Sequence, residues 1–208
     1  MLGFSIRKVL QALYYIQEGS GKGYQPYMYF VKMMYFADRH HVRHYGITIS
    51  GDHYLAMKMG PVASATLNIL KRRMPKIANR ADYDLLKEVQ NIDEYNVLIK
   101  KQLDDELSQS NKKSLDFAIV EFGNLDQFKL SDISHDYPEW IKHKEEIQYG
   151  LNNSVEKLSF PIPLEDFFED PVALPNSLNI RGISEDPYFE EDKEFLKAMK
   201  ESVHEATC

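Results

Sequence analysis

Three histidines close together, His40, His41 and His44, are the residues of this 208-residue chain best suited to chemistry. His40 and His44 are four residues apart, so on a helix they would share one face, as two ligands of a metal ion do. Asp38 or His53 could supply a third ligand. Against this, the glutamate of a His-Glu-x-x-His motif is missing, and the neighbouring arginines disfavour a cation. A metal-dependent enzyme centred on these histidines is therefore an alternative, and our prediction is that the chain uses neither a metal nor a cofactor.

A second set of reactive side chains is Ser134, His135 and Asp136. Catalytic groups must converge in space with a third residue that orients them, and sequence neighbours seldom do so. We interpret His135 as a histidine at a helix end that packs near Trp140.

Asp38 and Asp52 could form a pair of carboxylates. Nearby basic side chains offer them ordinary ion-pair partners instead: Arg39, Arg43 and Lys58. We therefore predict no catalytic residue, and a chain that is not an enzyme.

The histidines lie in a helix predicted over residues 29–45. Its buried face would be formed by residues at three- and four-residue steps: Phe30, Met33, Met34, Ala37, His41 and Tyr45. Lys32, Arg39 and Arg43 fall off that face. Gly46 should end the helix, because glycine accepts the left-handed conformation of a C-terminal cap.

Shorter elements follow that helix. We predict a turn at Ser50–Asp52, a strand over 54–59 that Gly60-Pro61 breaks, and a helix over 62–70. The strand would complete a small antiparallel sheet with strands at 83–89 and 95–100.

Further helices are predicted on both sides of this region. Ser5 is the expected cap of the first, and the third should carry Phe128, Leu130 and Ile133 inward. Their ranges are 4–18, 111–123, 127–135, 138–149 and 190–205, and the third could be a turn instead of a helix.

Two separated blocks of residues together resemble a known family. The first block reads Lys32-x-x-Tyr35-Phe36-Ala37-Asp38-Arg39-x-His41, Tyr45-Gly46, Ser50-Gly51-Asp52-x-Tyr54-x-Ala56 and Gly60-Pro61-Val62. The second reads Leu130-x-x-Ile133-Ser134-His135-x-x-Pro138-x-Trp140. In this order and at this separation the chain resembles the SocA-like antitoxin family, also called the Panacea domain, over residues 5–150.

The resemblance implies a bacterial or prophage protein that neutralises a cognate toxin by direct contact, and some members act as adaptors that hand the toxin to an ATP-dependent protease. It also implies structural or partner-binding roles for the matching residues: Lys32, Tyr35, Phe36, Asp38, His41, Tyr45, Gly46, Asp52, Tyr54, Gly60, Pro61, Val62, His135, Pro138 and Trp140. The chain departs from the family pattern at His40-His41 and at Glu139.

The expected fold is α+β: a mainly helical single domain, residues 1–150, with a small antiparallel sheet. Residues 151–208 form an acidic extension with 13 Asp and Glu against 5 Lys and Arg. It contains five prolines and ends in a helix. Between Phe160 and Asp186 it should be extended and irregular.

The extension has two readings. It could bind a partner through aromatic anchors, or it could wrap its own domain and cover the basic first half. The candidate anchors are Phe167, Phe168, Tyr188 and Phe195.

Charge is distributed unevenly along the chain. Residues 1–80 hold 12 Lys and Arg against 3 Asp and Glu, while residues 81–208 hold 13 against 29, for a net charge of −7. The basic half makes a nucleic-acid-binding regulator an alternative. Because no helix-turn-helix, zinc finger or other reader module accompanies it, we do not expect a nucleic-acid partner.

Composition is that of an ordinary globular protein, with 43% hydrophobic residues. No apolar run approaches the roughly 20 residues of a membrane span, and the N-terminus lacks the pattern of a signal peptide. The single cysteine, Cys208, excludes an internal disulfide. We therefore expect a cytoplasmic protein with no membrane partner.

Overall fold

The computed structural model of the protein describes four stretches of the chain: residues 3–100, 106–155, 158–170 and 193–207. The fold is mainly helical with small antiparallel sheets, which confirms the predicted α+β class.

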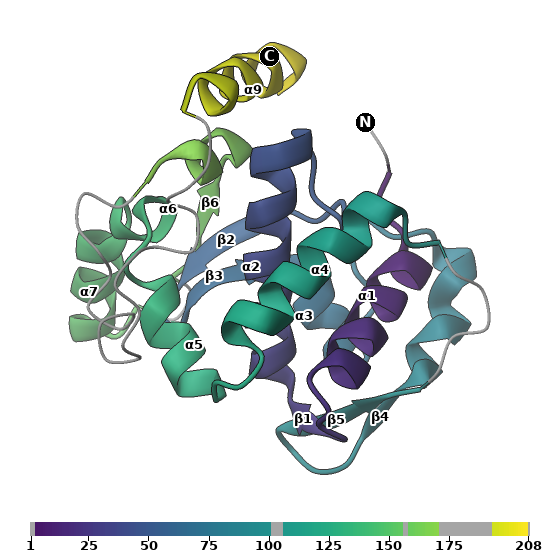
Figure 1. Cartoon of the computed structure of the whole chain (residues 1–208). Coiled ribbons are helices and arrows are strands. Elements are labelled where there is room, and N and C mark those ends of the chain that lie inside the picture. The colour runs from purple at the N-terminus through teal and green to yellow at the C-terminus, as the bar shows by residue number, and fades with distance from the viewer. Residues whose placement is uncertain (1–2, 101–105, 156–157, 171–192, 208) are drawn as a thin grey trace.

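Helix α2 (Tyr27–Tyr45) runs through the middle of the molecule, and elements from both halves of the chain pack around it (Figure 1). It ends as predicted at Gly46, where φ is 72°. The prediction that Lys32, Arg39 and Arg43 fall off the buried face is wrong, because all three side chains are fully buried. Segments from the second half of the chain cover that side of the helix.

Helices α1 (Ile6–Gly19), α4 (Gln109–Phe122) and α5 (Gln127–Ser134) pack against α2. The first two were predicted as helices and the third as a helix or turn. Ser5 caps α1 as expected, since its hydroxyl accepts a hydrogen bond from the Lys8 amide at 3.2 Å.

One side chain of α5 faces solvent, although it was predicted to face the core. Phe128 is 63% exposed, while Leu130 and Ile133 are buried. Residues 128 and 130 are separated by about 200° around a helix, so they cannot share a face.

A first sheet contains β2 (Tyr54–Met57), β3 (Gly60–Ala63) and β6 (Phe160–Ile162), in the order β3-β2-β6. The prediction that Gly60-Pro61 breaks the strand is wrong. The chain reverses at residues 58–59, so that Gly60 pairs with Met57 and begins β3. Pro61 is tolerated because β3 is an edge strand. Helix α3 (Ser64–Leu70) follows directly.

The second sheet has the order β1-β5-β4 and contains β1 (Gln25–Pro26), β5 (Asn96–Ile99) and β4 (Val89–Asn91). The predicted strand over 83–89 is wrong except at its end, because Arg80–Glu88 forms the 3-10 helix η1. The prediction that the 54–59 strand completes this sheet is also wrong, since β1 takes that edge.

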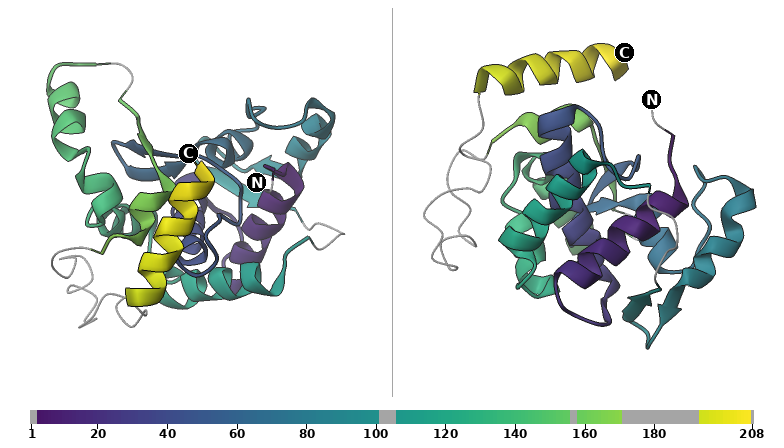
Figure 2. Two further views of the ribbon diagram at one scale, coloured as in Figure 1. Left: turned by 90° about the horizontal axis from the view of Figure 1, so that it is seen from above. Right: turned by 45° about the vertical axis from the view of Figure 1, so that its right-hand side comes forward.

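The helix predicted over 138–149 is two helices, α6 (Pro138–Ile141) and α7 (Lys144–Asn152). The region predicted to be irregular contains β6 and the 3-10 helix η2 (Leu164–Phe168), which packs on α2. Helix α9 (Lys193–Thr207) contacts α2 and η2, and Figure 2 shows it from two further directions.

None of the helices in the described residues is long and apolar enough to cross a membrane.

Candidate functional site

The β2–β3 hairpin is held by side chains from three different helices. Each donates to a backbone carbonyl in or beside the turn: Trp140 Nε1 to Met57 O (2.9 Å), Ser131 Oγ to Met59 O (2.9 Å) and Lys32 Nζ to Pro61 O (2.9 Å). We call these three bonds the hairpin clamp. They join the first signature block to the second, which explains why both blocks belong to one fold.

Burial shifts the pKa values of two basic groups beside the clamp. It holds the pKa of Lys32 well below its usual range. Burial, and then the nearby Lys32 charge, lowers the pKa of His135 to about 4. The His135 ring lies 4.0 Å from the Trp140 ring, as predicted from the sequence. Burial therefore disfavours the charged form of both groups.

Gly60 allows these groups to approach the turn. Its φ is 95°, and a Cβ atom at this position would lie 2.2 Å from Ser134 Oγ and 2.4 Å from Lys32 Nζ. No other residue type fits without moving the clamp.

Ser134 and His135 do not form the nucleophile and base of a catalytic pair. Ser134 Oγ donates instead to the Ser131 carbonyl at 2.7 Å, a bond within its own helix.

Asp38 organises the chain that follows α2. Its carboxylate accepts hydrogen bonds from the Ile49 amide (2.6 Å), the Ser50 hydroxyl (2.5 Å) and the Tyr54 hydroxyl (2.7 Å). Burial raises the pKa of Asp38, and these donors oppose the rise.

Asp52 caps helix α3, accepting hydrogen bonds from the Ala65 amide at 2.9 Å and the Thr66 amide at 2.7 Å. A carboxylate is favoured there by the free amides of the helix N-terminus. The two aspartates thus bind amides and hydroxyls, and the predicted ion pairs are wrong for the basic residues proposed: Arg39, Arg43 and Lys58.

Arg39 forms its ion pair with Glu139, from the second signature block. The distance from Nε to Oε1 is 3.0 Å, and both side chains are fully buried. Tyr35 donates to the same oxygen at 2.6 Å, and the guanidinium lies 4.4 Å from the centre of the Tyr137 ring. Arg39 also donates to the Glu169 carbonyl at 2.7 Å.

Arg43 binds the same C-terminal segment. It donates to the Phe167 carbonyl at 2.8 Å and to the Asp170 carboxylate at 2.7 Å. Two buried arginines of the basic first half are therefore neutralised from within the chain.

The extension reaches the core through these contacts and through β6. Phe167 is fully buried and Phe168 is 7% exposed, so both pack inside the protein. Phe195, on α9, is 44% exposed. Tyr188 lies outside the described residues.

His40 and His44 stack on each other with their ring centres 4.1 Å apart. His40 Nδ1 lies 2.9 Å from Ser114 Oγ, and His44 Nδ1 lies 2.8 Å from the His40 carbonyl. Burial, followed by the nearby charges of His44, His41 and Arg43, lowers the pKa of His40 to about 3.

His41 points to a different neighbourhood, where Nδ1 lies 2.7 Å from the Ile47 carbonyl and Nε2 lies 3.0 Å from the Asn111 amide nitrogen. The suggested third ligands are elsewhere: Asp38 is bound as described, and His53 is exposed. Across the described stretches, no group of three His, Cys, Asp or Glu side chains could hold a metal ion.

Most of the remaining signature residues lie in the interior or begin an element. Phe36 stacks on Phe122 at 3.9 Å, Val62 is buried in β3, and Pro138 begins α6. Tyr45 differs from them, because its side chain is 40% exposed.

Several partners of the signature residues were missed from the sequence. Ser50 stood within a signature block, and Glu139 was noted only as a departure from the family pattern. Ser131 and Tyr137 gave no local signal, and neither did Asp170, the partner of Arg43, because each contact joins segments far apart along the chain.

A family model described as "Antitoxin SocA-like, Panacea domain" matches residues 30–141, more than half of the chain. This range contains both signature blocks, the hairpin clamp and the Arg39–Glu139 pair. No curated protein and no solved structure matches the chain.

Proposed function

Because the chain belongs to the SocA-like antitoxin family, we propose that it acts as an antitoxin that neutralises one cognate toxin by direct protein–protein contact. The observation that carries this proposal is the family match over residues 30–141. We further propose that it works in the cytoplasm and has no catalytic activity of its own.

The burial of the signature residues supports a binding role. Their polar groups are engaged in the hairpin clamp, in the Asp38 and Asp52 networks and in the Arg39–Glu139 pair. Residues engaged in this way stabilise a scaffold, so the toxin is expected to contact side chains that the signature does not include.

The test is co-expression with the product of the adjacent gene. The neighbouring gene product should stop growth when expressed alone and be harmless when this protein is co-expressed. The two purified proteins should then elute together from a gel-filtration column. If no neighbouring product is toxic, or if toxicity persists despite equal expression, the proposal fails.

The amount of toxin separates two modes of neutralisation. If the protein acts by covering the toxin, the toxin level stays constant during rescue. If it acts as an adaptor for proteolysis, the toxin level falls, and the fall disappears in a host that lacks the ATP-dependent protease.

A further inference from the structure

The segment that follows α3 carries an uncompensated positive charge. Residues 71–80 contain five basic residues and no acidic one: Lys71, Arg72, Arg73, Lys76 and Arg80. Within the described part of the chain none of the five forms an ion pair, and all except Lys71 are exposed. Potentials from clustered unpaired charges attract partners of opposite charge.

The backbone holds this segment in an unusual conformation. Arg72 has φ 53°, in the left-handed region that normally favours glycine. The Arg72 amide donates to the Ile69 carbonyl (2.8 Å) and the Arg73 amide to the Asn68 carbonyl (2.7 Å), which is the Schellman arrangement of a helix end. An arginine is therefore kept at a position where glycine would fit with less strain.

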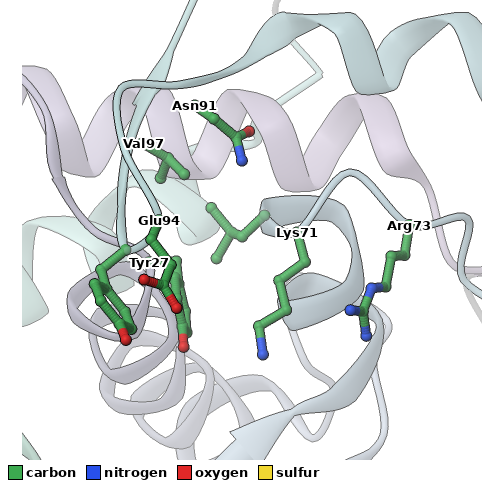
Figure 3. A pocket seen from close by; sticks show the side chains of 8 residues that line it. Tyr27, Lys71, Arg73, Asn91, Glu94 and Val97 are labelled. Carbon is green, nitrogen blue, oxygen red and sulfur yellow. The ribbon is translucent and has the colours of Figure 1, made fainter.

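This turn places Lys71 and Arg73 in the lining of one pocket of about 270 Å³. Leu70 and Val97 are its buried apolar residues, and Tyr27 and Tyr95 contribute aromatic rings. Figure 3 shows Lys71 and Arg73 on one side and Glu94 and Tyr27 on the other. Asn91 completes the lining.

Lys71 is positioned by an aromatic ring and not by a carboxylate. Its Nζ atom lies 4.8 Å from the centre of the Tyr27 ring. Glu94 is associated with Tyr95, and it raises the pKa of that tyrosine by accepting a hydrogen bond and by its charge. The two cations of the pocket therefore remain available for a negative group.

We propose that this basic pocket binds an acidic segment of a protein partner, with an aspartate or glutamate side chain between Lys71 and Arg73. An arginine can receive such a carboxylate in a bidentate manner. If the partner is the toxin, the inference rests on the proposed function.

The side chains beside the pocket favour a protein segment over a nucleic acid. Three aromatic or aliphatic side chains in these segments are exposed, and such side chains are typical of protein interfaces: Tyr95 of the lining, Ile92, which follows Asn91, and Ile77 of the basic segment.

The test measures binding of three probes to the full chain by fluorescence anisotropy. The probes are a labelled peptide of alternating Asp and Glu, the same peptide with Asn and Gln, and a single-stranded DNA of equal length. The acidic peptide should bind more tightly than both, and Lys71→Glu/Arg73→Glu should weaken its binding by about tenfold or more.

A control pair makes the same change in charge elsewhere. Lys113→Glu/Lys129→Glu alters two exposed lysines of α4 and α5 and should leave peptide binding within about twofold of wild type. Tyr95→Ala keeps the charge of the pocket but removes one of its aromatic rings, and should also weaken binding. Equal losses from both charge reversals, or no binding of the acidic peptide, would overturn the proposal. Preferential binding of the DNA would overturn it as well.

The toxin assay keeps the two proposals distinguishable. If the wild type neutralises and Lys71→Glu/Arg73→Glu neutralises equally well, the pocket is not the toxin site and the antitoxin proposal stands. If no neighbouring product is neutralised, the antitoxin proposal fails while the peptide measurement still decides the chemistry of the pocket.

Discussion

At the scale of single residues, the protein depends on buried polar groups that pair with one another. Arg39 and Glu139 are both fully buried, and two tyrosines, Tyr35 and Tyr137, contact them. Removing one partner of such a pair leaves an uncompensated charge in the interior. The second signature block therefore contributes its carboxylate mainly to folding.

We expect Glu139→Ala to lower the free energy of unfolding by about 3–5 kcal/mol, because Arg39 keeps its charge and loses its partner. Urea denaturation measures the change. The double variant Arg39→Met/Glu139→Leu should lose less than Glu139→Ala, since it removes both charges. Glu145→Ala, at an exposed position of α7, serves as the control. A single variant as stable as wild type would contradict this account of the pair.

His40 predicts a dependence of stability on pH. Its pKa falls from 6.5 to about 3 on folding, so between these values the unfolded chain binds a proton that the folded chain does not. The contribution of neutral His40 to the free energy of unfolding is therefore complete above pH 6.5, and it is lost as the pH falls toward 3. After allowance for the solvent exposure of the ring, we expect His40→Gln to remove about 1–2 kcal/mol of the loss between pH 7 and pH 5.

The measurement is urea denaturation of wild type and His40→Gln at both pH values. His53→Gln, at an exposed position, is the control and should keep the wild-type dependence. If the two variants and the wild type lose the same free energy of unfolding between pH 7 and pH 5, His40 does not cause the pH dependence.

At the scale of secondary structure, the hairpin clamp is the contact most sensitive to shape. Three helices reach the turn between β2 and β3, and Gly60 provides the space that they need.

Gly60→Ala should destabilise the protein by about 3 kcal/mol or more, because the added carbon overlaps two side chains at a φ that alanine rarely adopts. Thermal unfolding measures the effect as a lower Tm. Gly23→Ala is the matched control, since a carbon there meets no atom within 4 Å. Equal Tm values for the two variants would show that the turn tolerates a Cβ.

The sequence predicted most helices and the end of α2 at Gly46, because periodicity and capping are local signals. It could not assign Lys32, Arg39 and Arg43 to the interior. Arg39 contacts Glu139, 100 residues away, and Arg43 contacts Asp170, 127 residues away. Lys32 contacts Pro61, 29 residues away. The strand predicted over 83–89 was wrong for a local reason. Leu85 and Leu86 are adjacent, so the apolar residues of this segment do not alternate as those of a half-buried strand do.

Part of the candidate site could also be predicted from the sequence. The two signature blocks identified the family, and their residues were expected to be structural or partner-binding. The basic pocket was not predicted. Its lining comes from α2, α3, β4 and β5 and from the segments that follow α3 and β4. Basic residues such as Lys71, Arg72 and Arg73 are common at the end of a helix, so they gave no separate signal of a binding site.

At the scale of the whole molecule, the C-terminal extension contributes to the core up to Asp170 and adds α9 as an outer helix. Strand β6 pairs with β2, and Arg43 binds the carbonyl of Phe167. Beyond that segment, Leu196 and Val203 are the buried side chains of α9.

These contacts predict different results for two truncations. A chain that ends at Asp170 should still unfold cooperatively, with a loss of about 3–5 kcal/mol from the apolar area under α9. A chain that ends at Gly150 should lose cooperative unfolding, because Arg39 and Arg43 are then buried without partners or exposed with the core. Circular dichroism during heating distinguishes the two. A cooperative transition in the shorter chain would contradict the assignment of residues 158–170 to the core.

The hairpin clamp holds main-chain oxygens and leaves the side chain of Lys58 in solvent. The side chain at position 58 can thus be exchanged or labelled while the carbonyls of Met57 and Met59 keep their hydrogen bonds to the helices. A fluorophore attached at position 58 would therefore leave the three bonds of the hairpin clamp in place.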